Sequence, residues 1–108
     1  MEPEQDNRWY AVRSLFQSPG ETESAYEERI TLWQATSSEE ARSRAESEAE
    51  EYAEFAGAAY LSGFGQVYPL ADAPPRDGAE IFALTRDSDL AADAYVDRFF
   101  ATGREREL

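Results

Sequence analysis

Two stretches near the start of the chain have the alternating pattern of β-strands and lie close enough to pair. Residues 8–16 (RWYAVRSLF) and 26–35 (YEERITLWQA) are rich in aromatic and aliphatic side chains, and Pro19 and Gly20 lie between them. Strand-like segments separated by turn residues are typical of a β-hairpin. This hairpin limits the possible folds more than any other feature, because its pairing decides which side chains share each face of a sheet.

The hydrophobic alternation predicts a particular register for the two strands. If Val12 pairs with Ile30, the aliphatic residues of both strands collect on one side, which we expect the helices to cover. The other side then carries two facing tryptophans and two facing arginines: Trp9, Arg13, Arg29 and Trp33. Facing like charges are unfavourable, and tryptophans on an open sheet face are unusual in a monomer. We therefore interpret these four residues as a binding surface that another group covers.

Three kinds of group are candidates to cover this surface. A tail or loop of the same chain can fold over it, with an acid such as Glu27 neutralising the arginines. A second copy of the protein can pack face to face about a two-fold axis, the commonest symmetry of soluble oligomers. A planar or anionic ligand can stack on the tryptophans and bind the arginines. The pattern leaves all three open.

The segment after the hairpin has the signals of a helix. Ser37 and Glu40 have the spacing of a capping box, and Gly57 is a typical C-terminal stop. Small residues recur at helical spacing between these points: Ala41, Ala45, Ala49, Ala53 and Ala56. Because such a stripe forms one apolar face, we expect the helix to lie close against the sheet.

The remainder of the chain predicts two more strands and a second helix. We expect strands over residues 59–70 and 79–86, with the glycines around Phe64 marking a bulge or a close approach. The second helix is predicted to be capped by residues 87–89 and ended by Gly103. The predicted fold class is α+β: a four-stranded, mostly antiparallel sheet in β-β-α-β-β-α order, with two helices packed on one face.

The 108 residues are enough for one domain and too few for two. We expect a single α+β domain over residues 8–103, which contain all the predicted elements. Residues 1–7 are predicted to form a disordered N-terminal tail, and residues 104–108 a charged C-terminal tail.

The chain contains no histidine and no cysteine. Thiol nucleophiles, imidazole bases and the usual zinc ligands are therefore excluded. Asp87, Asp89 and Asp93 lie close together, but their spacing is not that of a calcium loop, and acids are common at helix starts. We predict no catalytic residue, no metal site and no cofactor, so an enzyme is the less favoured interpretation.

The charge is strongly negative, with 23 acidic residues against 10 arginines and a net charge of −13. Such a surface repels nucleic-acid phosphates, so the expected partners are a second copy or a basic protein, with no nucleic acid. The acidic start of the chain is not a secretory signal, and no apolar run approaches the roughly 20 residues that cross a bilayer. We therefore expect a cytoplasmic protein without membrane contact.

Several stretches together resemble a known family: WYAVRSLF, YEERITLWQATSSEEA, AEIFALTRDSDL and YVDRFF. Over residues 8–103 the chain is similar to domain of unknown function family 4288, a family of small bacterial proteins. The resemblance supports the domain limits. It implies no established activity and no catalytic residue to transfer.

Three functions are compatible with these observations. The favoured one is a small acidic binding or regulatory protein that acts through protein–protein contacts, above all as a homodimer. The first alternative is an immunity-type protein that neutralises a basic toxin or nuclease, which the negative charge favours. The second alternative is a small-ligand-binding protein or enzyme that uses arginine and tyrosine side chains, with Arg13 and Arg29 as its central residues.

Overall fold

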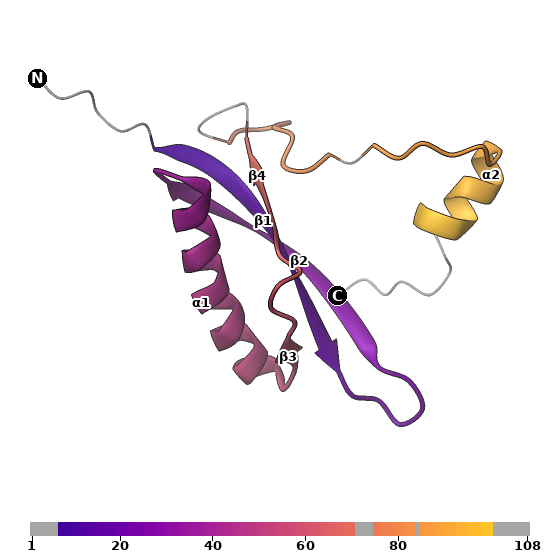
Figure 1. Cartoon of the computed structure of the whole chain (residues 1–108), viewed down its shortest axis with the longest axis horizontal. Helices are drawn as coiled ribbons and strands as arrows, with labels where there is room; N and C mark the ends of the chain where they lie inside the picture. The colour runs from indigo at the N-terminus through magenta and orange to yellow at the C-terminus, as the bar shows by residue number, and fades with distance from the viewer. Residues whose placement is uncertain (1–6, 71–74, 84, 101–108) are drawn as a thin grey trace, which may run out of the picture.

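The computed structural model describes residues 7–70, 75–83 and 85–100 (Figure 1). Its elements are β1 Arg8–Ser18, β2 Ala25–Ala35, α1 Ser38–Ala56, β3 Ala59–Tyr60, β4 Gln66–Pro69, α2 Ala92–Tyr95 and a π-helical turn, η1 Val96–Phe100. The predicted tail 104–108, Gly103 and the predicted tail 1–7 except Asn7 lie outside the described residues. No helix in the described part has the length and apolar character needed to cross a membrane.

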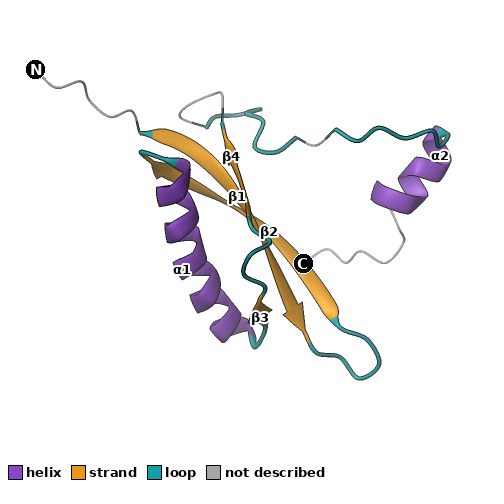
Figure 2. Ribbon diagram, viewed as in Figure 1, coloured by secondary structure: helices purple, strands orange, loops and turns teal. Residues whose placement is uncertain are grey.

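The four strands form one antiparallel sheet with β1 at its centre. β2 pairs with one edge of β1 over its whole length, and both β3 and β4 pair with the other edge. α1 lies across one face of this sheet (Figure 2). The predicted α+β class is therefore confirmed, with a four-stranded antiparallel sheet and two helices.

The segment predicted as one long third strand supplies both short strands on the far edge of β1. Residues 61–65 separate β3 from β4, and Gly63 has a left-handed φ of 89° there, which glycine adopts without strain. The predicted strand over 79–86 is wrong, since none of its described residues belongs to a strand. Both edges of β1 are occupied, by β2 on one side and by β3 and β4 on the other, and the described residues of this segment pair with none of the outer edges of the sheet.

The predicted packing of a second helix on the sheet is also wrong. Among the described residues, α2 and η1 contact each other and no strand, and α2 stands away from the sheet (Figure 1). The predicted cap at residues 87–89 does not form, and the hydroxyl of Ser88 instead accepts the backbone N–H of Leu90 at 3.1 Å in a local turn. This local turn competes with the start of a helix, and α2 begins only after Ala91, without a side-chain cap.

The register of the hairpin differs from the prediction by one residue. Val12 pairs with Thr31 and not with Ile30. A slip of one residue moves every side chain of a strand to the other face. The predicted facing pairs of tryptophans and of arginines are therefore wrong, and β2 turns its aliphatic side away from α1.

The alanines of α1 explain why this register is favoured. The buried face of the helix consists of small side chains: Ala41, Ala45, Ala49 and Ala53. They bring the helix close to the sheet but fill little volume, and protein interiors are packed without large voids. The indole of Trp33 supplies that volume, packing against the buried cluster that contains Tyr10 and Val12. The smaller Leu32 would fill less of this space.

The predicted limits of α1 agree with the structure, and its ends show why. The hydroxyl of Ser37 accepts the backbone N–H of Glu40 at 3.0 Å, and the Glu40 carboxylate reaches back to the N–H of Thr36 at 2.9 Å. Gly57 ends the helix with a left-handed φ of 69°. Free backbone N–H groups at the start of the helix and free carbonyls at its end thus find hydrogen-bond partners within the neighbouring residues.

Phe16 is the residue whose truncation we expect to destabilise the fold most. Its side chain is 1% exposed, with the rings of Tyr52 and Tyr60 at centroid distances of 5.1 and 5.6 Å. Phe16→Ala should lower the free energy of unfolding by about 3–5 kcal/mol. The matched control is Phe55→Ala, which truncates a side chain that is 89% exposed and should change stability by less than about 0.5 kcal/mol. Urea unfolding followed by circular dichroism measures both, and equal losses would contradict the assigned core.

The charges of α1 predict how salt affects stability. Its acids are Glu39, Glu40, Glu46, Glu48, Glu50, Glu51 and Glu54. Its two arginines donate to backbone carbonyls, Arg42 to Gly65 at 3.1 Å and Arg44 to Gln34 at 2.7 Å. Acids one turn apart repel by a few tenths of a kcal/mol per pair, and salt screens that repulsion. The melting temperature at pH 7 should therefore rise as sodium chloride increases to about 0.5 M; a steady fall would mean that ion pairs dominate.

Candidate functional site

The four residues predicted to form one binding surface lie on opposite faces of the sheet. Arg29 and Trp33 face α1, whereas Trp9 and Arg13 face away from it. Arg29 and Trp33 do share one side of β2, as their spacing predicts. The group that covers that side is α1 of the same chain, so these two residues belong to the packing between helix and sheet.

Arg29 is held by aromatic and acidic groups of its own chain. Its guanidinium lies 3.7 Å from the ring centroid of Tyr52 and pairs with both carboxylate oxygens of Glu48, at 3.1 and 3.2 Å. The Tyr52 hydroxyl in turn donates to Glu27 at 2.6 Å. These contacts connect β2 to the C-terminal half of α1, and they leave Arg29 little capacity to bind an anionic ligand.

Trp33 is likewise held in place by its own chain. The indole N–H donates to the hydroxyl of Thr31 at 2.7 Å, and the guanidinium of Arg44 lies 5.2 Å from the ring centroid. The half-buried indole thus has a hydrogen-bond partner and a cation above its face, which is a common structural arrangement for tryptophan. A ligand that stacks on Trp33 would have to displace these groups.

The carboxylate of Glu27 raises the pKa of the Tyr52 hydroxyl above its ordinary value, mainly through the hydrogen bond between them. The folded state therefore binds this proton more tightly than the unfolded state does. The resulting stabilisation is complete below the ordinary tyrosine pKa of about 10 and is lost as the pH rises through the raised value.

Replacing Tyr52 should have an effect on stability that depends on pH. Tyr52→Phe removes the hydrogen bond to Glu27, so it should destabilise the fold at pH 8. The difference from wild type should shrink as the pH rises above about 10, where the wild-type hydroxyl loses its proton. Urea unfolding across this range measures the difference. The companion variant Glu27→Gln keeps an acceptor without the charge and should bring the pKa of Tyr52 back toward its ordinary value; an unchanged pKa would refute this cause.

The sheet face opposite α1, here called the open face, carries many apolar side chains. The strand residues directed to it are Trp9, Ala11, Arg13, Leu15, Gln17, Tyr26, Glu28, Ile30, Leu32, Gln34, Ala59, Gln66 and Tyr68. Tyr26, Ile30 and Leu32 are 62%, 39% and 41% exposed. Aliphatic side chains in a row on an outer face are typical of interaction surfaces.

Arg13 is the centre of the polar part of this face. Its Nε donates to Glu28 at 2.7 Å and its Nη1 donates to Gln66 at 3.3 Å. The hydroxyl of Tyr68 donates to the same Gln66 oxygen. The hydrogen bond to Glu28 also holds the pKa of Arg13 above its ordinary value. Arg13 therefore stays protonated and acts as a positive anchor, with no capacity to serve as a base.

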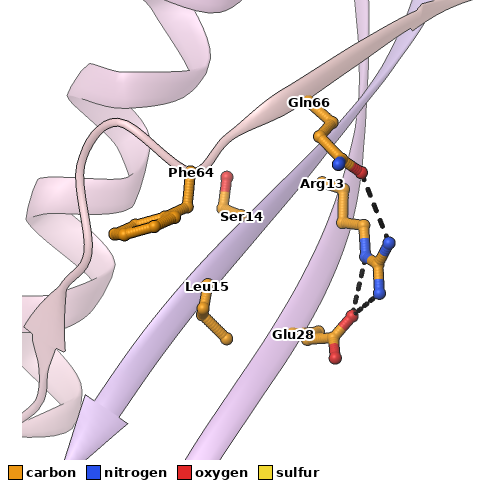
Figure 3. A pocket seen from close by; sticks show the side chains of 6 residues that line it. All are labelled: Arg13, Ser14, Leu15, Glu28, Phe64 and Gln66. Carbon is orange, nitrogen blue, oxygen red and sulfur yellow. Dashed lines mark hydrogen bonds and ion pairs between the residues drawn. The ribbon is translucent and has the colours of Figure 1, made fainter.

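A shallow hollow lies beside this ion pair, where the sheet edge is interrupted between β3 and β4 (Figure 3). It has a volume of about 210 Å³ and is lined by Arg13, Ser14, Leu15, Glu28, Phe64 and Gln66. Ligand pockets usually measure about 300–1,000 Å³ and cover most of their ligand. The hollow is below that size, so it suits a single side chain of a partner better than a substrate.

The described residues contain no group of three acidic side chains placed to hold a metal ion, and this includes Asp87, Asp89 and Asp93. The chemistry of the open face is therefore that of apolar contact around one ion pair. The sequence pattern identified Arg13 and Trp9 on this face but missed Glu28, Gln66 and the neighbouring Phe82. With the observed register, Glu28 would have been found, because it then lies diagonally opposite Arg13.

The comparisons with known proteins give no match among family models, curated proteins or solved structures. The resemblance to domain of unknown function family 4288 therefore stays a prediction.

Proposed function

We propose that this chain is an acidic, cytoplasmic binding protein without catalytic activity, and that it works as a homodimer formed through the open face. The observation that carries the proposal is the row of exposed apolar residues on the outer side of β2: Tyr26, Ile30 and Leu32. When a second surface covers apolar side chains that were exposed to water, the free energy of the system falls. A two-fold axis lets one patch serve both protomers.

The distribution of charge supports association of two acidic copies through this face. Glu28 is the one acidic residue among the strand side chains of the open face, and Arg13 neutralises it. The many acids of α1 lie on the opposite side of the sheet. Two copies that meet through their open faces therefore keep their most acidic surfaces apart, which limits the repulsion expected from a net charge of −13.

The exposed surface of α1 supports a second candidate function, the neutralisation of a basic protein. Glu50, Glu51 and Glu54 are exposed on this helix next to Phe55, which is 89% exposed. An aromatic side chain surrounded by carboxylates suits a basic partner with an apolar contact point. The ligand-binding alternative has less support, because Arg29 is paired beneath α1 and the hollow at Arg13 is small.

The homodimer predicts a specific effect of charge on the open face. Wild type should elute with the mass of a dimer at about 50 μM in light scattering, with an interface that buries at least ~1,000 Å². Ile30→Asp places an unpaired charge in that interface and should weaken the dimer at least about 100-fold, since such a charge costs roughly 3 kcal/mol or more. The control Ser43→Asp adds the same charge to an exposed position on α1 and should leave the dimer intact. A monomeric wild type would contradict the proposed function.

A further inference from the structure

The C-terminal arm, defined as residues 75–83 and 85–100, exposes several large apolar side chains. Its exposed large side chains are Ile81, Leu90, Val96, Phe99 and Phe100. Phe100 is 78% exposed, although it belongs to an ordered turn, η1. In the described residues, α2 and η1 touch no strand. The arm therefore presents an apolar surface that requires a partner surface, as the open face does.

The end of the arm is ordered before it contacts anything else. The ring of Phe99 packs against Tyr95 at a centroid distance of 5.0 Å, and the guanidinium of Arg86 lies 4.5 Å above the Phe99 ring. Arg86 also donates to the hydroxyl of Tyr95 at 3.1 Å. A surface that is already organised loses less conformational entropy when it docks.

The start of the arm shows that the open face accepts aromatic side chains of this segment. Phe82 packs edge-on against Tyr68 at a centroid distance of 5.0 Å, and the guanidinium of Arg13 lies 5.1 Å from the centre of its ring. Both Tyr68 and Arg13 belong to the open face. The arm therefore already occupies one side of that face, while the apolar side chains of β2 stay exposed.

Beyond Phe82 the arm runs away from the sheet of its own chain (Figure 1), and residues 85–90 are exposed. The radius of gyration is 16.8 Å, against about 13 Å for a compact chain of about 100 residues. The end of the arm is thus placed to meet another molecule.

The exposed apolar area of the open face and the arm is large enough for a stable dimer interface. Apolar side chains exposed on the open face and on the arm offer roughly 50–150 Å² each, given that a large aromatic ring buries about 150–250 Å² when fully covered. Eight such side chains per protomer make sixteen in a two-fold dimer, so mutual coverage would bury roughly 800–2,400 Å², a range that includes the size of a specific interface. Phe99 and Phe100 are aromatic residues of the kind that dominate such interfaces.

We propose that the open face of each protomer is covered by the C-terminal arm of a second copy, so that α2 and η1 pack against Ile30 and Leu32 of the partner. This arm exchange rests on the proposed homodimer and names the segment that fills its interface. It also explains why α2 and η1 have no contact with the strands of their own chain.

The absence of cysteine from the chain allows a direct test by disulfide cross-linking. Two single variants, Ile30→Cys and Val96→Cys, are made with tags of different size, unfolded together, refolded and oxidised mildly. Arm exchange predicts a cross-linked species that contains one chain of each variant. The control pair, Ser43→Cys with Val96→Cys, should give none, because Ser43 is exposed on α1 and away from the open face.

A double variant with both Ile30→Cys and Val96→Cys separates exchange from folding back within one chain. A disulfide within a single chain of the double variant, with no mixed species from the single variants, would overturn the exchange. A dimer that Ile30→Asp disrupts but that never forms the mixed cross-link would also overturn it, while the proposed homodimer would stand. A wild type that is monomeric would overturn both.

A substitution in the arm gives an independent readout that does not depend on cross-linking. Phe100→Ser should raise the dimer dissociation constant about 10- to 100-fold, the effect expected when a buried phenylalanine contact is lost. Phe55→Ser removes an equally large exposed side chain from α1 and should leave the dissociation constant unchanged. Equal constants for Phe100→Ser and wild type, measured by sedimentation, would contradict a role of the arm in the interface.

Discussion

Val12 pairs with Thr31 across the hairpin, and the positions of all other functional groups depend on that register. It places Arg29 and Trp33 of β2 against α1, where Glu48, Tyr52 and Arg44 hold them. A slip of one residue would exchange these side chains for the aliphatic ones. The helix would then face Ile30 and Leu32, and Glu48 and Tyr52 of α1 would lose their contacts with the guanidinium of Arg29.

The small side chains of α1 and the polar cluster beneath it depend on each other. Buried alanines contribute little apolar area, so the helix needs further contacts to stay on the sheet. The guanidinium of Arg29 provides them by packing its plane on Tyr52 while pairing with Glu48, which lies on the same helix. Arginine suits this position because it stacks on a ring and binds a carboxylate at the same time.

The features that the sequence predicted well were those set by local signals. Ser37, Glu40 and Gly57 define both ends of α1, and these signals act within a single turn of the helix. The hairpin and the α+β class follow from alternation and turn residues in the same way. The glycines around Phe64 were recognised as an irregularity, and the strand does break there.

The features that the sequence did not predict depend on contacts between distant segments. The register required knowing that the alanine face of α1 leaves room for Trp33, and hydrophobic alternation alone favours the aliphatic side of β2. The segment 79–86 alternates like a strand, but its described residues pair with no edge of the sheet, and Phe82 instead packs its ring against Tyr68. Arg13 and Trp9 were placed on the open face correctly, whereas Arg29 and Trp33 moved to the helix side together with the register.

The register of the hairpin also determines on which side of the sheet the charged side chains lie. Since the aliphatic side of β2 faces outward, the open face combines apolar side chains with the neutralised pair of Arg13 and Glu28. The acids of α1 lie on the opposite side of the sheet. Repulsion between copies acts over about a Debye length, roughly 8–10 Å at physiological salt, whereas apolar contact acts only where surfaces touch. The acidic surface of α1 therefore opposes the approach of a second copy from its side of the sheet, whereas contact through the open faces keeps the two acidic helices apart.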